Sequence, residues 1–202
     1  MTQKTIKKYI FIFVFLLPST YSHAEWPKKP SDFRLLPQYC KALLIPEFKK
    51  TQYKHWARII GPGFGHSHHF CAAMFSYLQA DRIFPKNKEE KQRKKFLYRE
   101  TINEIEYIEK NVKSKRYKLW PEVYSLKAEA YERMGDTKKA IRYFMKAIQS
   151  NPRYPRSYAA FASFLQKNHQ KKQAIKILKI GLKYNPKSKM LKSKLSRISH
   201  KK

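Results

Sequence analysis

The sequence predicts an all-α protein: a short row of helical hairpins with an irregular segment before it and a capping helix after it. Three observations support this fold class. Only five of the 202 residues are glycine, and β-rich folds usually need more glycines for their turns. Apolar residues recur at helical spacing in the second half of the chain. A pattern of small and apolar residues also repeats there at a fixed offset of 34 residues, as from Ala128 to Ala162.

Residues 1–24 resemble a secretory signal. Three lysines precede the apolar run Ile10–Leu17, and a short polar stretch ends in Ser22-His23-Ala24. This order predicts export and cleavage after Ala24. A membrane anchor is the weaker alternative, because a spanning helix needs about 20 apolar residues. We therefore expect a periplasmic or secreted protein.

The chain is strongly basic. It has 45 Lys and Arg against 14 Asp and Glu, a net charge of +31, and the three lysines of residues 1–24 leave +28 on the remainder. Such a charge permits binding to nucleic acid or weak contact with an anionic envelope surface, or it reflects composition alone. Export argues against nucleic acid, and the lysines are spread along the chain rather than clustered in one motif.

Residues 25–65 are expected to be irregular, because five prolines prevent one long helix. Residues 66–116 are expected to form a degenerate helical hairpin. Its helices would be Phe70–Ala80 and Phe96–Val112, and the basic stretch Pro85–Lys95 would be an insertion that lengthens the turn between them.

Residues 121–154 and 155–188 align as two copies of one unit. Each copy has small or apolar residues at matching positions, a turn signal at its middle (Gly135-Asp136 and Asn168-His169) and Asn-Pro near its end. Apolar residues three and four apart share one face of a helix, and the small residues allow two helices to pack closely. The matched pairs are Tyr124/Tyr158, Ala128/Ala162, Tyr131/Leu165, Ala140/Ala174, Phe144/Leu178, Ala147/Gly181 and Pro152/Pro186. Residues 189–202 are expected to form a capping helix and a basic tail.

The repeated unit resembles the tetratricopeptide repeat (TPR), a helix–turn–helix of 34 residues. The sequence departs from the family pattern at Lys127, where leucine is usual, and at His169, where glycine is usual. Tyr39-Cys40, Trp56 and the segment 66–71 (HSHHFC) also resemble a group of small exported bacterial TPR proteins.

The resemblance implies a concave surface lined by positions 2, 5, 9 and 12 of each repeat. Carried over, these positions predict a binding groove with an acidic half and a basic half for another protein or peptide. Its residues are Glu122, Ser125, Glu129, Glu132, Arg156, Ser163, Gln166 and Lys167. TPR proteins that clamp a C-terminal carboxylate use lysine and asparagine here, so that activity is not supported.

Cys40 and Cys71 are the two cysteines of the chain. An even count in an exported protein favours a disulfide. The bond would join the segment 25–65 to the first helix of the array.

The histidines His66, His68 and His69 next to Cys71 suggest a metal or haem site, or merely a turn into a helix. A structural zinc site needs four ligands, and an oxidised Cys71 cannot be one of them.

The leading hypothesis, from the repeat and the predicted signal, is a non-enzymatic adaptor or assembly factor of the bacterial periplasm that needs no cofactor. The alternative is a metal- or haem-handling protein.

Overall fold

The computed structural model describes residues 26–200, which contain α-helices and 3-10 turns and, within that range, no strand. The all-α prediction is confirmed. Residues 1–24, where the secretory signal is expected, and the last two residues of the basic tail lie outside the described range. The helices are α1 (Gln38–Leu44), α2 (Pro46–Ile60), α3 (Ser67–Arg82), α4 (Lys88–Asn111), α5 (Trp120–Arg133), α6 (Thr137–Ser150), α7 (Pro155–Lys167), α8 (Lys171–Tyr184) and α9 (Lys189–His200), with 3-10 turns η1 (Pro30–Phe33) and η2 (Phe64–His66).

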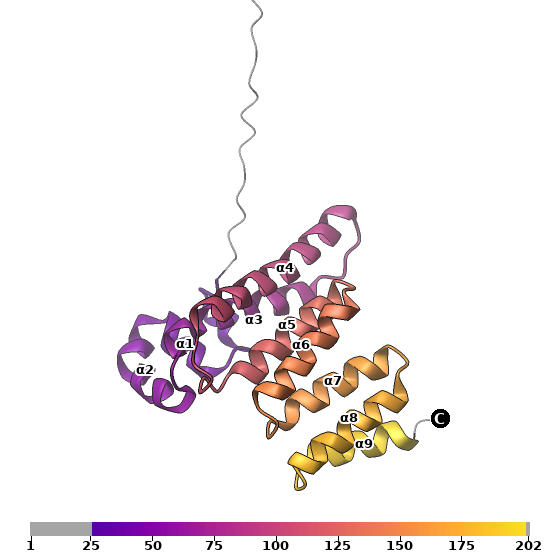
Figure 1. Ribbon diagram of the computed structural model, residues 1–202. Coiled ribbons are helices and arrows are strands. Elements are labelled where there is room, and N and C mark those ends of the chain that lie inside the picture. Colours follow the sequence, from indigo (N-terminus) through magenta and orange to yellow (C-terminus); the bar gives the residue numbers. More distant parts are fainter. Residues whose placement is uncertain (1–25, 201–202) are drawn as a thin grey trace, which may run out of the picture.

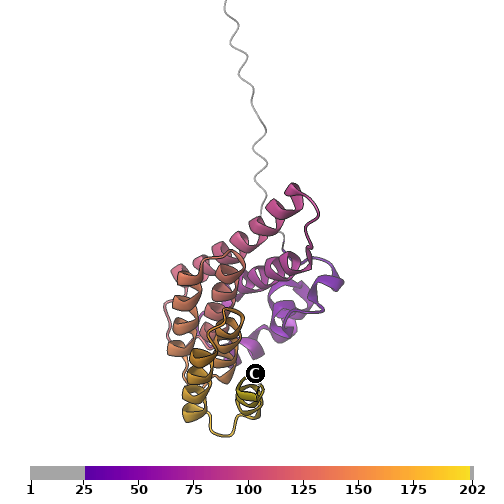
Figure 2. The same cartoon turned by 90° about the vertical axis from the view of Figure 1, so that its right-hand side faces the viewer.

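Three antiparallel hairpins, α3–α4, α5–α6 and α7–α8, follow one another along the molecule, and α9 packs against α8 and α7 at its C-terminal end (Figures 1 and 2). One apolar core runs under these hairpins from Tyr77 to Ile198. A second core contains residues of η1, α1, the end of α2, α3, the second half of α4 and the start of α5. No helix within the described range is long and apolar enough to cross a membrane.

The two repeats superimpose in their local features. Helices α6 and α8 begin at Thr137 and Lys171, 34 residues apart, and the turn before each holds a residue with left-handed φ: Gly135 at 81° and His169 at 58°. Gly181 stands at the repeat position that Ala147 occupies in the first copy, and a steric restriction explains why it is glycine. A Cβ atom at Gly181 would lie 2.7 Å from Cγ of Tyr158, so glycine lets α8 approach α7 closely.

The segment 25–65 is not irregular, which corrects the sequence prediction. It contains a helical hairpin, α1–α2. Three of its five prolines begin helices or helical turns instead of interrupting them: Pro30 is the first residue of η1, Pro37 is the N-cap residue of α1 and Pro46 is the first residue of α2. Proline is tolerated at these positions because the first N–H groups of a helix have no intrahelical partner.

The basic stretch Pro85–Lys95 is also not an insertion in a turn. Helix α4 already begins at Lys88, where the side chain of Asn87 accepts a 2.8 Å hydrogen bond from the backbone N–H of Glu90. Most of the stretch therefore forms the exposed first turns of a long helix. The polar composition hid this helix because its first turns have no buried face.

Candidate functional site

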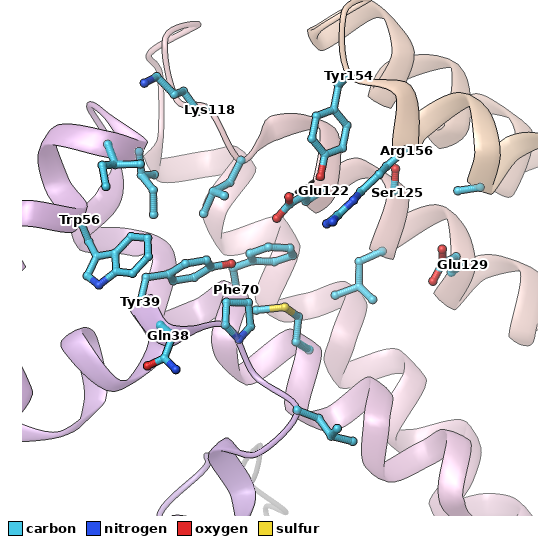
Figure 3. Close-up of a pocket in the computed structure, with 18 residues that line it drawn as sticks. Gln38, Tyr39, Trp56, Phe70, Lys118, Glu122, Ser125, Glu129, Tyr154 and Arg156 are labelled. Carbon is cyan, nitrogen blue, oxygen red and sulfur yellow. Dashed lines mark hydrogen bonds between the residues drawn. The ribbon is translucent and has the colours of Figure 1, made fainter. Parts of the chain in front are cut away.

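A cavity of about 720 Å³ opens between the N-terminal hairpin and the first helices of the two repeats. In Figure 3, Tyr39 and Trp56 lie on one side of it and Glu122, Tyr154 and Arg156 on the other. Its lining is mainly apolar and comes from five helices and the loops beside them. The lining residues are Leu35, Pro37, Gln38, Tyr39, Trp56, Ile59, Ile60, Phe70, Met74, Lys118, Leu119, Glu122, Ser125, Leu126, Glu129, Tyr154, Arg156 and Ala160.

Helix α5 presents three of the predicted groove residues to this cavity. Glu122, Ser125 and Glu129 are three and four residues apart, so they share one helix face. Arg156 joins them from the first turn of α7.

A second, smaller cavity of about 290 Å³ continues along the same surface. Glu132, Ser163 and Lys167 line it, and Glu129 and Ala160 line both cavities. The structure thus brings seven of the eight predicted groove residues to one continuous surface. Gln166 lines neither cavity.

The opposite wall was missed by sequence reasoning. Tyr39 of α1, Trp56 and Ile59 of α2, and Phe70 and Met74 of α3 supply most of its apolar surface. One signal pointed to it: Tyr39 precedes Cys40 and Phe70 precedes Cys71, so a bond between the cysteines places the two rings at one site.

That bond is present. Cys40 and Cys71 form a disulfide with a Cα–Cα distance of 5.7 Å, and both residues are fully buried. It joins α1 to α3 directly beneath the cavity. The predicted pairing is therefore correct, and it links the N-terminal hairpin to the array.

Four charged groups of this surface form ion pairs with one another. Arg133 Nη2 lies 3.0 Å from Asp81 Oδ2, and Lys167 Nζ lies 3.1 Å from Glu132 Oε1. The hydroxyl of Tyr154 donates a hydrogen bond to Glu122. The two ion pairs neutralise charge, whereas the third contact only satisfies a hydrogen-bond acceptor of Glu122.

Glu129 differs from these groups. No hydrogen bond or ion pair within 4 Å joins its carboxylate to another described residue. Burial, together with the nearby carboxylate of Glu132, raises the pKa of Glu129 to about 7. The nearby cations Lys167 and Arg133 act in the opposite direction and lower the pKa, but burial outweighs them, and each forms its ion pair with another carboxylate.

Three buried polar atoms of the cavity lining also meet no hydrogen-bond partner among the described residues. They are the hydroxyl of Tyr39, Nε1 of Trp56 and Oγ of Ser125. Burial raises the pKa of Tyr39 well above its usual value, so this hydroxyl keeps its proton and is available as a donor. Buried polar groups are normally hydrogen-bonded, which makes three unpaired atoms in one cavity unusual.

Replacing Glu129 by glutamine should stabilise the protein at alkaline pH. Because the folded-state pKa of about 7 lies above the value of 4.5 for an ordinary glutamate, the folded state binds the proton more tightly and wild type loses stability as pH rises between these values. Above about pH 7 the charged carboxylate of Glu129 has lowered the stability of wild type by its full amount. We expect Glu129→Gln to exceed wild type by about 2 kcal/mol near pH 8 and by less than about 0.5 kcal/mol near pH 4.5.

Urea unfolding followed by circular dichroism at both pH values measures this difference. Glu89→Gln, at an exposed position on α4, changes the charge equally and should show no such pH dependence. An equal effect of the two variants would contradict the assignment of the shift to Glu129.

The histidines are not arranged as a metal site. Nδ1 of His68 lies 2.6 Å from the carbonyl oxygen of Gly65, and Nδ1 of His69 lies 2.5 Å from Oε2 of Glu104. Cys71 is in the disulfide. Across the described part of the chain, no three His, Cys, Asp or Glu side chains converge as metal ligands would. The predicted metal set His66, His68 and His69 is therefore not supported by the donor geometry.

The same histidines have a packing role. The ring of His69 stacks on Tyr107 with centroids 3.6 Å apart and meets the edge of Trp26 at 5.3 Å. His66 also lies against Tyr107, at 5.9 Å. Burial lowers the pKa of His68, which favours its neutral form in this aromatic cluster.

Comparison with known proteins gives one positive result. Residues 121–154 match the family model of the tetratricopeptide repeat, which covers helices α5 and α6 and the loop after them. No curated protein matches the chain.

Proposed function

Because this is a TPR-type protein, with a matched repeat at residues 121–154 and helical hairpins packed on both sides of it, we propose that it is a non-enzymatic module that binds a segment of another protein. The observation that carries the proposal is the mainly apolar cavity on the concave side of the repeats. TPR repeats generally mediate binding to proteins or peptides, and this cavity supplies the apolar anchor site that affinity requires.

The rim of the cavity supports the same proposal. Leu35 and Ile59 are 61% and 40% exposed, although both are large apolar residues. Exposed apolar residues grouped around a concavity mark interaction sites more often than scattered ones do. A bound segment would cover both side chains.

We further propose that the protein works in the periplasm, as an adaptor or assembly factor, after export and cleavage near Ala24. The sequence pattern of residues 1–24 supports export. The Cys40–Cys71 bond supports an oxidising compartment, where structural disulfides form and persist. The net charge of +31 is compatible with weak additional contact with an anionic envelope surface.

The rim residues provide a test with a matched control. A photo-crosslinking amino acid placed at Leu35 in the living cell should capture a protein partner, which mass spectrometry identifies. Leu35→Asp/Ile59→Asp should then weaken binding of the purified partner by at least about tenfold. Met145→Asp/Tyr184→Asp changes two residues that are 40% and 53% exposed and lie outside the cavity.

This control should change the affinity by less than about twofold, because exposed substitutions away from an interface have small effects. Absence of any protein crosslinked from Leu35, or an equal loss in both double variants, would disprove the proposed binding site.

A further inference from the structure

The cavity has two chemically different sides. On one side Tyr39, Trp56 and Phe70 form an apolar wall, and on the other Ser125 and Glu129 lie one turn apart on α5 (Figure 3). Tyr39 is only 5% exposed, yet its hydroxyl has no partner among the described residues. Leaving such a group unpaired costs about 1–3 kcal/mol. A ligand that brings its own polar groups into the cavity would remove that cost.

The charged residues of this surface indicate which charge the ligand should carry. Asp81 and Glu132 each have an ion-pair partner, and Glu122 accepts a hydrogen bond from Tyr154. Glu129 has neither among the described residues, although it lines both cavities. Arg133 and Lys167 lie near Glu129, but they form their ion pairs with Asp81 and Glu132, so a cation that binds beside Glu129 would give this carboxylate a direct partner.

The two cations of the cavity lining do not favour an anion instead. The guanidinium of Arg156 points toward Glu122 and Tyr154, and the side chain of Lys118 extends away from the other labelled residues (Figure 3). The net charge of +31 repels cations at long range, but salt screens that effect. A cation bound directly to the Glu129 carboxylate would be close to it and partly shielded from solvent, so salt would screen that contact much less.

We propose that this cavity is a specificity pocket for a peptide segment that carries a large aliphatic or aromatic side chain close to a lysine or arginine. The apolar side chain packs between Tyr39, Trp56 and Phe70, and a backbone carbonyl oxygen of the segment accepts a hydrogen bond from the Tyr39 hydroxyl. The cationic group binds the carboxylate of Glu129, and donors next to it reach Oγ of Ser125. This inference rests on the proposed function, because it names the chemistry of the segment that the same surface binds.

Peptide selection tests the inference without a known partner. Random peptides displayed on phage are selected against the full chain with its disulfide intact, at physiological salt. The enriched peptides should combine a large apolar residue with a nearby lysine or arginine. A synthetic enriched peptide and its derivative with glutamine in place of the cation are then titrated into wild type, Glu129→Gln and Glu89→Gln.

In wild type, loss of the cation should weaken binding about tenfold or more, the usual effect of removing a hydrogen bond to a charged group. The same change should matter less than about twofold in Glu129→Gln, and the Glu89→Gln control should behave as wild type. Glutamine has nearly the shape of glutamate and should preserve the fold, which circular dichroism checks.

Two results would overturn the inference while the proposed function survives: enrichment of acidic or purely apolar peptides, or an equal dependence on the cation in wild type and Glu129→Gln. A third result has a wider consequence. If Leu35→Asp/Ile59→Asp weakens no enriched peptide, the surface is not the binding site, and both the inference and the proposed function fail.

Discussion

Replacing both Cys40 and Cys71 by alanine should lower the free energy of unfolding by roughly 3–4 kcal/mol. The bond spans a sequence separation of 31 residues. In the chain-entropy model, a loop of this length restricts the unfolded chain by about that amount. Both residues are 0% exposed, so alanine, which adds no polar group to the core, is the appropriate replacement.

Denaturant unfolding with and without a reducing agent measures the effect. Wild type under reducing conditions should resemble the double variant, whereas the double variant should not respond to the reductant. Unchanged unfolding midpoints in the double variant would contradict a stabilising role of the bond.

The loss of stability should also be largest in the N-terminal hairpin α1–α2. The disulfide joins α1 to α3, and Tyr39 and Phe70 of the cavity wall are the neighbours of the two cysteines. Hydrogen exchange should therefore accelerate in α1 and α2, while α5 to α8 stay protected by their own core. Uniform acceleration throughout the chain would show that the bond supports the whole array instead.

Replacing Lys127 by alanine should cost about 3 kcal/mol, because it removes the cation from a buried ion pair and leaves a void. Lys127 is 1% exposed, and its Nζ lies 2.6 Å from Oε2 of Glu109 and 3.1 Å from Oε1 of Glu106. It also lies 4.6 Å from the ring centroid of Tyr143. Burial alone would lower the pKa of Lys127, but hydrogen bonds with Glu109, Tyr143 and Glu106 outweigh it and raise the pKa.

The raised pKa of Lys127 determines the pH range over which its replacement by alanine lowers stability. The stabilising contribution of Lys127 is fully present below about pH 10, the usual pKa of an unfolded lysine. The difference between wild type and Lys127→Ala should therefore be equal near pH 6 and near pH 8. Lys138→Ala, at an exposed position on α6, should cost less than about 0.5 kcal/mol.

Lys127→Met separates the two causes. Methionine restores most of the volume, and Glu109 keeps its 3.0 Å ion pair with Lys146. We expect this variant to recover at least about half of the loss, since apolar side chains often replace buried ion pairs at little cost. Equal destabilisation by alanine and methionine would show that the charge, rather than the packing, is what the site requires.

Lys127 also illustrates what the sequence could not reveal. The TPR pattern has leucine at this position, and the substitution looked like a local departure. Its reason lies in α4, where Glu106 and Glu109 project toward α5. A pairing between residues about 20 positions apart depends on how two helices cross, and no local pattern encodes that crossing.

The cavity likewise has one side that the sequence could predict and one side that it could not. The face of α5 that carries Glu122, Ser125 and Glu129 could be predicted, because helical periodicity determines which residues share a face. The apolar wall opposite could not, because it required the path of the chain from α1 to α3. The segment 25–65 was expected to be irregular, since its prolines could be counted but their positions at helix starts could not be recognised.

The sequence by itself determined the helical class and the 34-residue period, since both follow from local spacing, and the even cysteine count favoured a Cys40–Cys71 bond. Tertiary structure alone decided that α1 and α2 close one side of the groove, that Glu129 makes no ion pair within 4 Å among the described residues, and that the histidines pack against aromatic rings and one another without converging as metal ligands. These features depend on the distances between elements far apart in the chain, which packing establishes only when the whole core forms.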